Sequence, residues 1–364
     1  MRVGLQADDL TGACDAGAAF AARGLPTVVL LPDAPLPAPP PQVLVLDTES
    51  RGRDAAEARV RAREAATRLL GCGPALLFKK VDSTLRGAIA AELAGTLEGT
   101  GRRAALLAPS FPAQHRTVRD GVLHVAGQAA GETAIARDPT FPPTGDRVLA
   151  LLGADGPHPA GFVPLATVRR GPAAVAARLA RFEAVLACDA ETDADLDVLV
   201  AASERVPVLL AGSAGLATAL AARTAREPLR PAPRPRAPLL VVAGSVHPVT
   251  RAQLARLQER GIEGLWPPVQ GQADRAAVVR ELAEAARRRV GQAAPGTLLL
   301  TGGETAYSVC RALGADGIAL AGELEAGLAI GALVGGAFEG LAVVTKAGGF
   351  GDAETLVRLH EACA

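Results

Sequence analysis

Short apolar runs of β-type residues alternate along this chain with alanine-rich segments that carry leucine or isoleucine at helical spacing. Alternation of this kind is typical of a mostly parallel sheet that is covered by helices. It predicts strands at Arg2–Gln6, Val43–Asp47, Ala75–Lys79, Ala104–Ala108, Leu239–Ala243, Thr297–Thr301 and Leu341–Lys346. It predicts helices over 12–23, 53–70, 87–98, 248–260 and 304–313. The expected fold class is therefore α/β.

A proline-rich stretch divides the chain. Prolines stand at 228, 231, 233, 235 and 238. Proline fixes φ and removes a backbone donor, so this stretch favours a stiff connector over a helix or a central strand. With 364 residues, the chain is also long for a single core. We predict an N-terminal domain over 1–230, a linker over 231–237 and a C-terminal domain over 238–364, each with a mostly parallel sheet flanked by helices. The proline- and glycine-rich piece from about 110 to 165 predicts a hairpin or an irregular excursion.

Composition argues against several classes of partner and location. The formal net charge is zero and aromatic residues make up 3% of the chain. Nucleic acid and anionic membranes are therefore not expected partners. No apolar run approaches the roughly 20 residues that span a bilayer, and acids at Asp8 and Asp9 argue against a signal peptide. The five cysteines are scattered without a C-x-x-C pair, which predicts reduced thiols in the cytoplasm.

Polar side chains follow three predicted strands of the first domain. Asp8 and Asp9 follow the first strand, Arg51 lies just beyond another, and the segment Lys80–Arg86 follows a third. Two of the chain's three lysines stand at the last of these strand ends. Because the carboxyl ends of neighbouring parallel strands meet at one edge of a sheet, we expect these turns to form one crevice.

The side chains of this expected crevice are of two kinds. Arg51, Lys80 and Arg86 suit an anionic small molecule, since a guanidinium grips a carboxylate with two hydrogen bonds. Aspartates can bind hydroxyl groups or accept a proton, and three are available: Asp8, Asp9 and Asp82. The mixture favours a polyhydroxylated acid over an apolar ligand.

Three glycine-rich turns follow predicted strands of the second domain, and each precedes a helix. They are Gly244–Pro248, Gly302–Thr305 and Lys346–Asp352. Free backbone N–H groups at such turns and helix N-termini are the elements of a phosphate-binding cradle. No Walker motif occurs, and no G-x-G-x-x-G follows the first strand. The missing fingerprint argues against an NAD-dependent oxidoreductase.

Several motifs occur in the order in which one family carries them. They are Ala7–Gly12, Lys79–Gly87, Ala108–Pro112 with Asp120–Val122, Gly244-Ser245 with Pro248–Thr250, Gly302–Thr305 and Lys346–Gly351. On these motifs the chain resembles the four-carbon acid sugar kinases from about residue 3 to 355. The resemblance implies an acid-sugar-binding N-terminal domain and an ATP-binding C-terminal domain. It also implies ATP-dependent phosphorylation of the terminal hydroxyl of threonate, erythronate or a 3-oxo-tetronate.

The resemblance also assigns residues. Substrate contacts fall on Asp8, Asp9, Arg51, Lys80, Asp82 and Ser83, to which the charge pattern adds Arg86. Nucleotide contacts fall on Ser245, Gly302, Gly303, Glu304, Thr305 and Gly348, with Gly349 in the same turn. Two positions depart from the family pattern, because Cys14 and Gly349 stand where the family usually has asparagine.

The expected chemistry is phosphoryl transfer in a cleft between the two domains, because both sets of polar turns follow strands. Asp82 is the preferred general base, and Asp8 or Asp9 is the alternative. Mg²⁺ is expected, held mainly by the nucleotide phosphates and water, so no metal site built from protein ligands is predicted. The alternative function is a sugar-acid-binding or regulatory protein of the same fold that lost catalysis. A homo-oligomer stays open.

Overall fold

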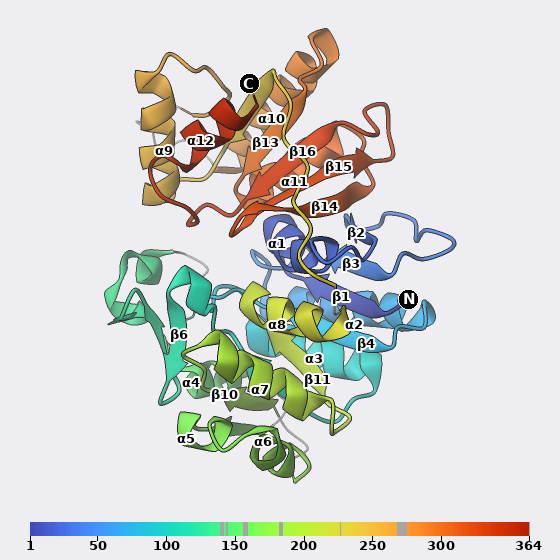
Figure 1. The fold of residues 1–364 in the computed structure, drawn as a ribbon, viewed down its shortest axis with the longest axis vertical. Coiled ribbons are helices and arrows are strands. Elements are labelled where there is room, and N and C mark those ends of the chain that lie inside the picture. Colours follow the sequence, from blue (N-terminus) through green and yellow to red (C-terminus); the bar gives the residue numbers. More distant parts are fainter. Residues whose placement is uncertain are drawn as a thin grey trace. The chain divides into compact units, whose positions relative to one another are not determined.

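The chain folds into two compact units, which we describe from a computed structural model of residues 1–138, 142, 145–155, 159–181, 185–225, 227–267 and 275–363 (Figure 1). Unit 1 consists of Met1–Asp8 and Gln42–Arg226, and unit 2 consists of Asp9–Pro41 and Glu227–Ala364. None of the described helices combines the length and the apolar character that a membrane span requires.

Unit 1 is built on a parallel sheet with the strand order β3-β1-β4-β11-β5-β10-β9. The strands are β1 (Val3–Ala7), β3 (Val43–Asp47), β4 (Leu76–Lys80), β5 (Ala105–Ala108), β9 (Ala160–Val163), β10 (Val185–Cys188) and β11 (Leu209–Gly212). The central strands are buried along nearly their whole length, which explains why they read as uninterrupted apolar runs.

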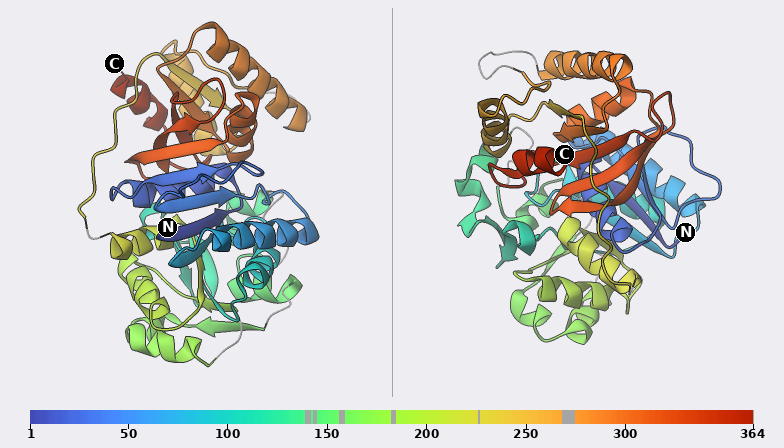
Figure 2. Two further views of the ribbon diagram at one scale, coloured as in Figure 1. Left: turned by 90° about the vertical axis from the view of Figure 1, so that its right-hand side faces the viewer. Right: turned by 45° about the horizontal axis from the view of Figure 1, so that its top comes forward.

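Helices connect these strands and flank the sheet, as the two views of Figure 2 show. They are α2 (Ala55–Gly71), α3 (Ile89–Thr100), α4 (Val148–Asp155), α5 (Leu165–Val168), α6 (Pro172–Leu179), α7 (Asp193–Ser203) and α8 (Ala214–Thr224). The excursion expected from 110 to 165 is confirmed in its described part as a small antiparallel sheet. Its strands are β6 (Arg116–Arg119), β7 (Val122–Val125) and β8 (Gln128–Ala129).

The strand register aligns the carboxyl ends of the central strands of unit 1. Ala7 pairs with Asp47 across β1 and β3, and Gln6 pairs with Lys79 across β1 and β4. Lys80 in turn pairs with Gly212 of β11. The polar turns after β1, β3 and β4 therefore lie at one edge of the sheet, as the alternation of strands and helices predicted.

Unit 2 contains a sheet with the order β12-β13-β16-β15-β14-β2. The strands β12 (Leu239–Ala243), β13 (Thr297–Thr301) and β16 (Ala342–Lys346) are parallel. Beyond β16 the pairing becomes antiparallel through β15 (Leu328–Val334), β14 (Gly317–Glu325) and β2 (Thr27–Leu30). The α/β class is confirmed, but the hairpin β14–β15 was not predicted. Its glycines and alanines give a weak strand signal.

Residues 9–41 lie in unit 2, whereas the sequence prediction grouped them with the rest of the first 230 residues. The cause is long-range packing. Strand β2 pairs antiparallel with β14, and α1 (Leu10–Ala21) packs against β14 and α11 (Gly303–Ala312). Neither contact leaves a mark on the local sequence pattern.

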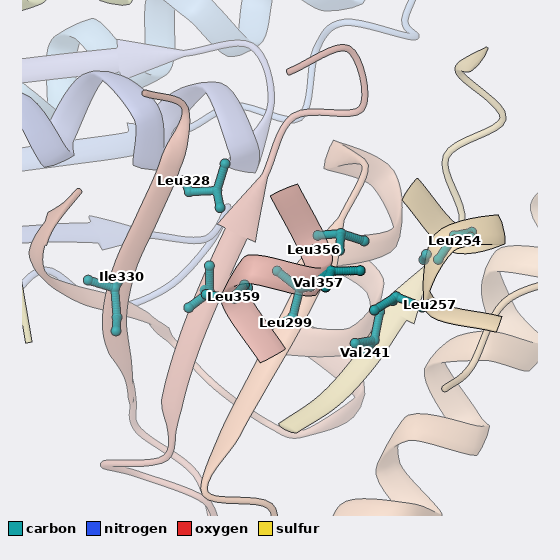
Figure 3. Close-up of a cluster of buried hydrophobic side chains, with 11 residues drawn as sticks. Val241, Leu254, Leu257, Leu299, Leu328, Ile330, Leu356, Val357 and Leu359 are labelled. Carbon is teal, nitrogen blue, oxygen red and sulfur yellow. The ribbon is translucent and has the colours of Figure 1, made fainter. Parts of the chain in front are cut away.

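The core of unit 2 lies between its sheet and two helices, α9 (Pro248–Glu259) and α12 (Thr355–Ala362), while α10 (Arg275–Gln292) packs against α11. Leu257 of α9 and Leu356 of α12 lie with Val241 and Leu299 of two neighbouring strands (Figure 3), and Val344 of β16 belongs to the same cluster. All five side chains are essentially inaccessible to water. Their burial fixes both helices on this face of the sheet, and the turns that precede the helices are positioned with them.

Candidate active site

The turn after β3 carries an arginine that is bound to the carboxylate after β1. Arg51 Nε lies 2.6 Å from Asp8 Oδ2, and Arg51 Nη2 lies 2.9 Å from Asp8 Oδ1, a bidentate pair. The same Nη2 is 3.4 Å from Asp82 Oδ1. One guanidinium therefore links the turns that follow β1, β3 and β4.

The turn after β4 is organised around Asp82. Arg86 donates from Nε to Oδ2 and from Nη2 to Oδ1 of Asp82, both at 3.0 Å, and the Thr84 hydroxyl and backbone N–H also donate to Oδ2. Leu85 has a φ of 64° and Gly87 a φ of 90°. These left-handed conformations turn the chain sharply enough for Arg86 to reach back to Asp82.

Electrostatics keeps two buried carboxylates of unit 1, those of Asp8 and Asp82, ionised. Burial opposes ionisation of Asp82, but the charges of Arg86, Arg51 and Lys80 outweigh it, so the pKa of Asp82 lies well below its usual value. The pKa of Asp8 is also lowered, because Arg51 and Lys80 together outweigh the effect of burial. Both groups are therefore ionised at neutral pH.

The two consecutive lysines of β4 have different surroundings. Side chains alternate between the two faces of a strand, so Lys79 and Lys80 point to opposite sides. Lys79 Nζ lies 2.7 Å from Glu92 Oε2, and both side chains are completely buried. Lys80 is 4% exposed, and its ammonium makes no hydrogen bond or ion pair with any residue that the structure describes. A buried cation in this state is suited to an anionic ligand.

A network of buried polar side chains holds the turn that carries Arg51. Glu92 of α3 accepts a hydrogen bond from Ser50 Oγ at 2.6 Å in addition to its ion pair with Lys79. Thr48 Oγ1 lies 2.8 Å from Ser50 Oγ and donates to the carbonyl of Ala7. These contacts tie the residue before Arg51 to β1 and α3. Sequence reasoning did not identify Ser50 or Glu92, because a buried glutamate on a helix gives no local signal.

The glycine-rich turns of unit 2 converge at the carboxyl ends of β12, β13 and β16. Ala243, Thr301 and Lys346 are in register across these strands. Gly302 donates its N–H to the carbonyl of Lys346 at 3.1 Å. A Cβ placed on Gly302 would lie 3.4 Å from the Cβ of Ser245, and one on Gly348 would collide with the Ser245 hydroxyl. The structure thus brings Ser245, Gly302 and Gly348 together, and we call this group of residues the cradle.

Asp9 belongs to unit 2 and lies at this cradle. Its Oδ1 accepts the N–H of Gly12 and so caps α1, while Oδ2 accepts a hydrogen bond from Thr11 Oγ1 at 2.8 Å. The Cα of Gly303, the first residue of α11, lies against the same carboxylate, because a Cβ there would collide with Asp9 Oδ2. Asp8 and Asp9 therefore have different neighbours, which the sequence did not distinguish.

The remaining predicted residues have mixed positions. Ser83 is buried in the Asp82 turn, and Thr305 packs against Gly244. Glu304 points to the surface, where it forms a 2.7 Å ion pair with Arg275. His247, which was not predicted, caps α9 through Nδ1 and lies against Gly349. Among the described residues no group of three or more His, Cys, Asp or Glu side chains could hold a metal ion.

Comparison with known families assigns different kinds of ligand to the two halves of the chain. A sugar-binding N-terminal domain model matches residues 3–220, and a nucleotide-binding C-terminal domain model matches residues 268–356. The chain is 35% identical over 409 residues to the D-threonate kinase of Bordetella bronchiseptica, with 99% of this chain and 97% of that kinase covered. The chain belongs to the four-carbon acid sugar kinase family. It is therefore a phosphotransferase.

The chain is also similar to a kinase that is named for a different four-carbon acid. It is 30% identical to the D-erythronate kinase of Heliobacterium modesticaldum, with 96% of this chain and 94% of that enzyme covered. A Haemophilus influenzae protein shares the fold with a TM-score of 0.77 at 22% identity, with 99% of this chain and 100% of that one covered. A Bordetella bronchiseptica relative, 33% identical with a TM-score of 0.54, covers 100% of this chain and 98% of its own, and was crystallised with citrate as a domain-swapped dimer.

Proposed function

We propose that this kinase phosphorylates the terminal hydroxyl of a four-carbon sugar acid, threonate or erythronate, with ATP as donor. The observation that carries the proposal is the buried Lys80 ammonium, which forms no ion pair with a described residue although its charge, like those of Arg51 and Arg86, acts on Asp82. A ligand carboxylate would complete this charge pattern. The activities by which two relatives are named, D-threonate kinase and D-erythronate kinase, support the same substrate class.

In this proposal unit 1 holds the acid. Lys80, with Arg51 and Arg86 beside it, binds the carboxylate. Asp8 and Asp82 keep the two guanidinium groups oriented, and their remaining lone pairs accept hydrogen bonds from substrate hydroxyls. Citrate is itself a hydroxylated carboxylate, so its presence in a relative's crystal fits a site of this chemical class.

The cradle of unit 2 fits the nucleotide. The N–H groups of Gly348 and Gly349 donate to no described residue, Gly348 leaves no room for a side chain, and the φ of 95° at Gly302 disfavours any residue but glycine. Ser245 adds a hydroxyl to this site. Gly303 and Thr305 stand in the first turn of α11, whose N-terminus favours phosphate oxygens. Mg²⁺ would be held mainly by the phosphates and water, and would neutralise charge on the transferring group.

For the general base we infer Asp9 rather than Asp82. The oxygens of Asp82 are bound by the guanidinium groups of Arg86 and Arg51 and its pKa is lowered, whereas the oxygens of Asp9 accept from the Thr11 hydroxyl and the Gly12 N–H. Asp9 lies beside Gly303, at the helix N-terminus where a terminal phosphate would bind. Phosphoryl transfer requires the acceptor hydroxyl, its base and the γ-phosphate to be adjacent. Asp9 is adjacent to the proposed phosphate site.

The experiment is a measurement of ADP release with a panel of acceptors. D-Threonate, L-threonate, D-erythronate and L-erythronate test the substrate class, and erythritol, which lacks the carboxylate, is the matched control. We expect turnover with at least one of the four acids and none with erythritol. Release of ADP with none of the acids would favour the alternative function, a binding or regulatory protein of this fold. The cytoplasm, where ATP is plentiful, is the proposed location.

A further inference from the structure

The glycine turn after β16 is held by three buried polar side chains. Lys346 Nζ donates to the carbonyls of Ala347 at 2.9 Å and Gly348 at 3.3 Å. From α9, Thr250 Oγ1 donates to the same Gly348 carbonyl at 2.7 Å. Gln253, one helical turn further on, donates from Nε2 to the carbonyls of Phe350 at 3.1 Å and Asp352 at 2.8 Å. Lys346, Thr250 and Gln253 are all 0% exposed.

The lysine in this set is costly to bury. Lys346 pairs with no carboxylate among the described parts of the chain, and burial lowers its pKa to about 7. A leucine or methionine would fill similar space without the desolvation penalty of an amine. The feature that an apolar residue could not supply is donation to the two turn carbonyls.

Fixing those carbonyls also fixes the adjacent N–H groups. In a trans peptide the C=O and N–H point in opposite directions. When the carbonyl oxygens of Ala347 and Gly348 are bound on the protein side, the N–H groups of Gly348 and Gly349 are directed away from it. Neither N–H has an acceptor in the described residues. Two consecutive donors are thus presented at the cradle, next to Ser245.

We propose that Lys346, Thr250 and Gln253 act as a carbonyl clamp that presents the Gly348 and Gly349 N–H groups to the nucleotide phosphates. The inference rests on the proposed nucleotide site in unit 2. The three are positioning residues, because they act on the ligand through the backbone of the turn. Without the clamp, the peptide planes of this glycine turn can rotate, and binding then has to order them.

The test is calorimetric titration of the full-length protein with ADP and Mg²⁺. Thr250→Val is nearly isosteric and removes one clamp bond, so the Kd for ADP should rise about 3- to 10-fold. Lys346→Met removes two bonds, and the Kd should rise about 10- to 100-fold. The KM for the sugar acid should stay unchanged in both variants, which a general loss of structure would not allow.

The matched control is Thr345→Val, in the same strand. Thr345 is 2% exposed, and its hydroxyl has no hydrogen-bond partner in the described structure. This variant should bind ADP like the wild type. Wild-type affinity in both Thr250→Val and Lys346→Met, or an equal loss in the control, would overturn the clamp alone. A wild-type protein that does not bind ADP would overturn the nucleotide site itself. If Lys346→Met does not fold, Thr250→Val still decides.

Discussion

Replacing Lys80 by methionine tests whether the positive charge of Lys80 binds a ligand or stabilises the fold. Lys80 is buried without a partner among the described residues, so the mutation leaves no carboxylate orphaned. A charged hydrogen bond to a ligand contributes about 1.5–3 kcal/mol, so the KM for the sugar acid should rise about 10- to 150-fold. Stability should change by less than about 1 kcal/mol, because loss of a favourable field at Asp8 and Asp82 is offset by relief of desolvation.

Lys79→Met is the matched control, one residue away in the same strand. It leaves the Glu92 carboxylate buried without its cation, which costs about 3–5 kcal/mol of folding stability. The assays are steady-state kinetics at saturating ATP and urea denaturation of both variants. A Lys80→Met enzyme with wild-type KM for the acid, or two variants with the same profile, would refute the assignment of Lys80 to the ligand.

Three further predictions concern catalysis, the cradle and pH. Asp9→Asn should lower kcat about 10²- to 10⁴-fold with little change in the KM for either substrate. Asp82→Asn should mainly raise the KM for the acid, because Arg86 loses the carboxylate that orients it. The reverse pattern in steady-state kinetics would make Asp82 the base. Gly303→Ala places a Cβ against the Asp9 carboxylate and should raise the KM for ATP about 5- to 150-fold; an unchanged value excludes close approach there. Burial lowers the pKa of Lys346 from 10.5 to about 7, so between these pH values the unfolded chain binds more protons and stability rises with pH. Urea denaturation at pH 7, 8 and 9 should show this rise, at most about 1.4 kcal/mol per pH unit, in the wild type and not in Lys346→Met; parallel curves would contradict it.

Much of the fold could be predicted because burial leaves a strong local pattern. Strands covered on both faces read as apolar runs, and polar residues such as Asp8 and Lys80 stand where those runs end. Parallel pairing then places the ends at one edge without further information. Strand alternation alone would also have separated Lys79 from Lys80, since consecutive side chains face opposite ways.

The rest depends on contacts between distant parts of the chain. The packing of α1 beside α11, which brings Asp9 to Gly303, has no local signature. The residues of the carbonyl clamp leave a weak signal in the sequence. Thr250 and Gln253 are polar residues three positions apart on the buried face of α9. Lys346 is the third lysine of the chain, and it stands at a strand end before a glycine turn.

The most direct test of the central claim is the identity of the phosphorylated product. The full-length protein, ATP, Mg²⁺ and the most active of the four-carbon acids are incubated, and the product is examined by ³¹P and ¹³C NMR. The account predicts a monophosphate whose phosphorus couples to the terminal, fourth carbon, formed together with an equal amount of ADP, and lost in Asp9→Asn. A phosphate on the carboxylate or on an internal hydroxyl would contradict it. So would ADP formed in the same amount without the acid.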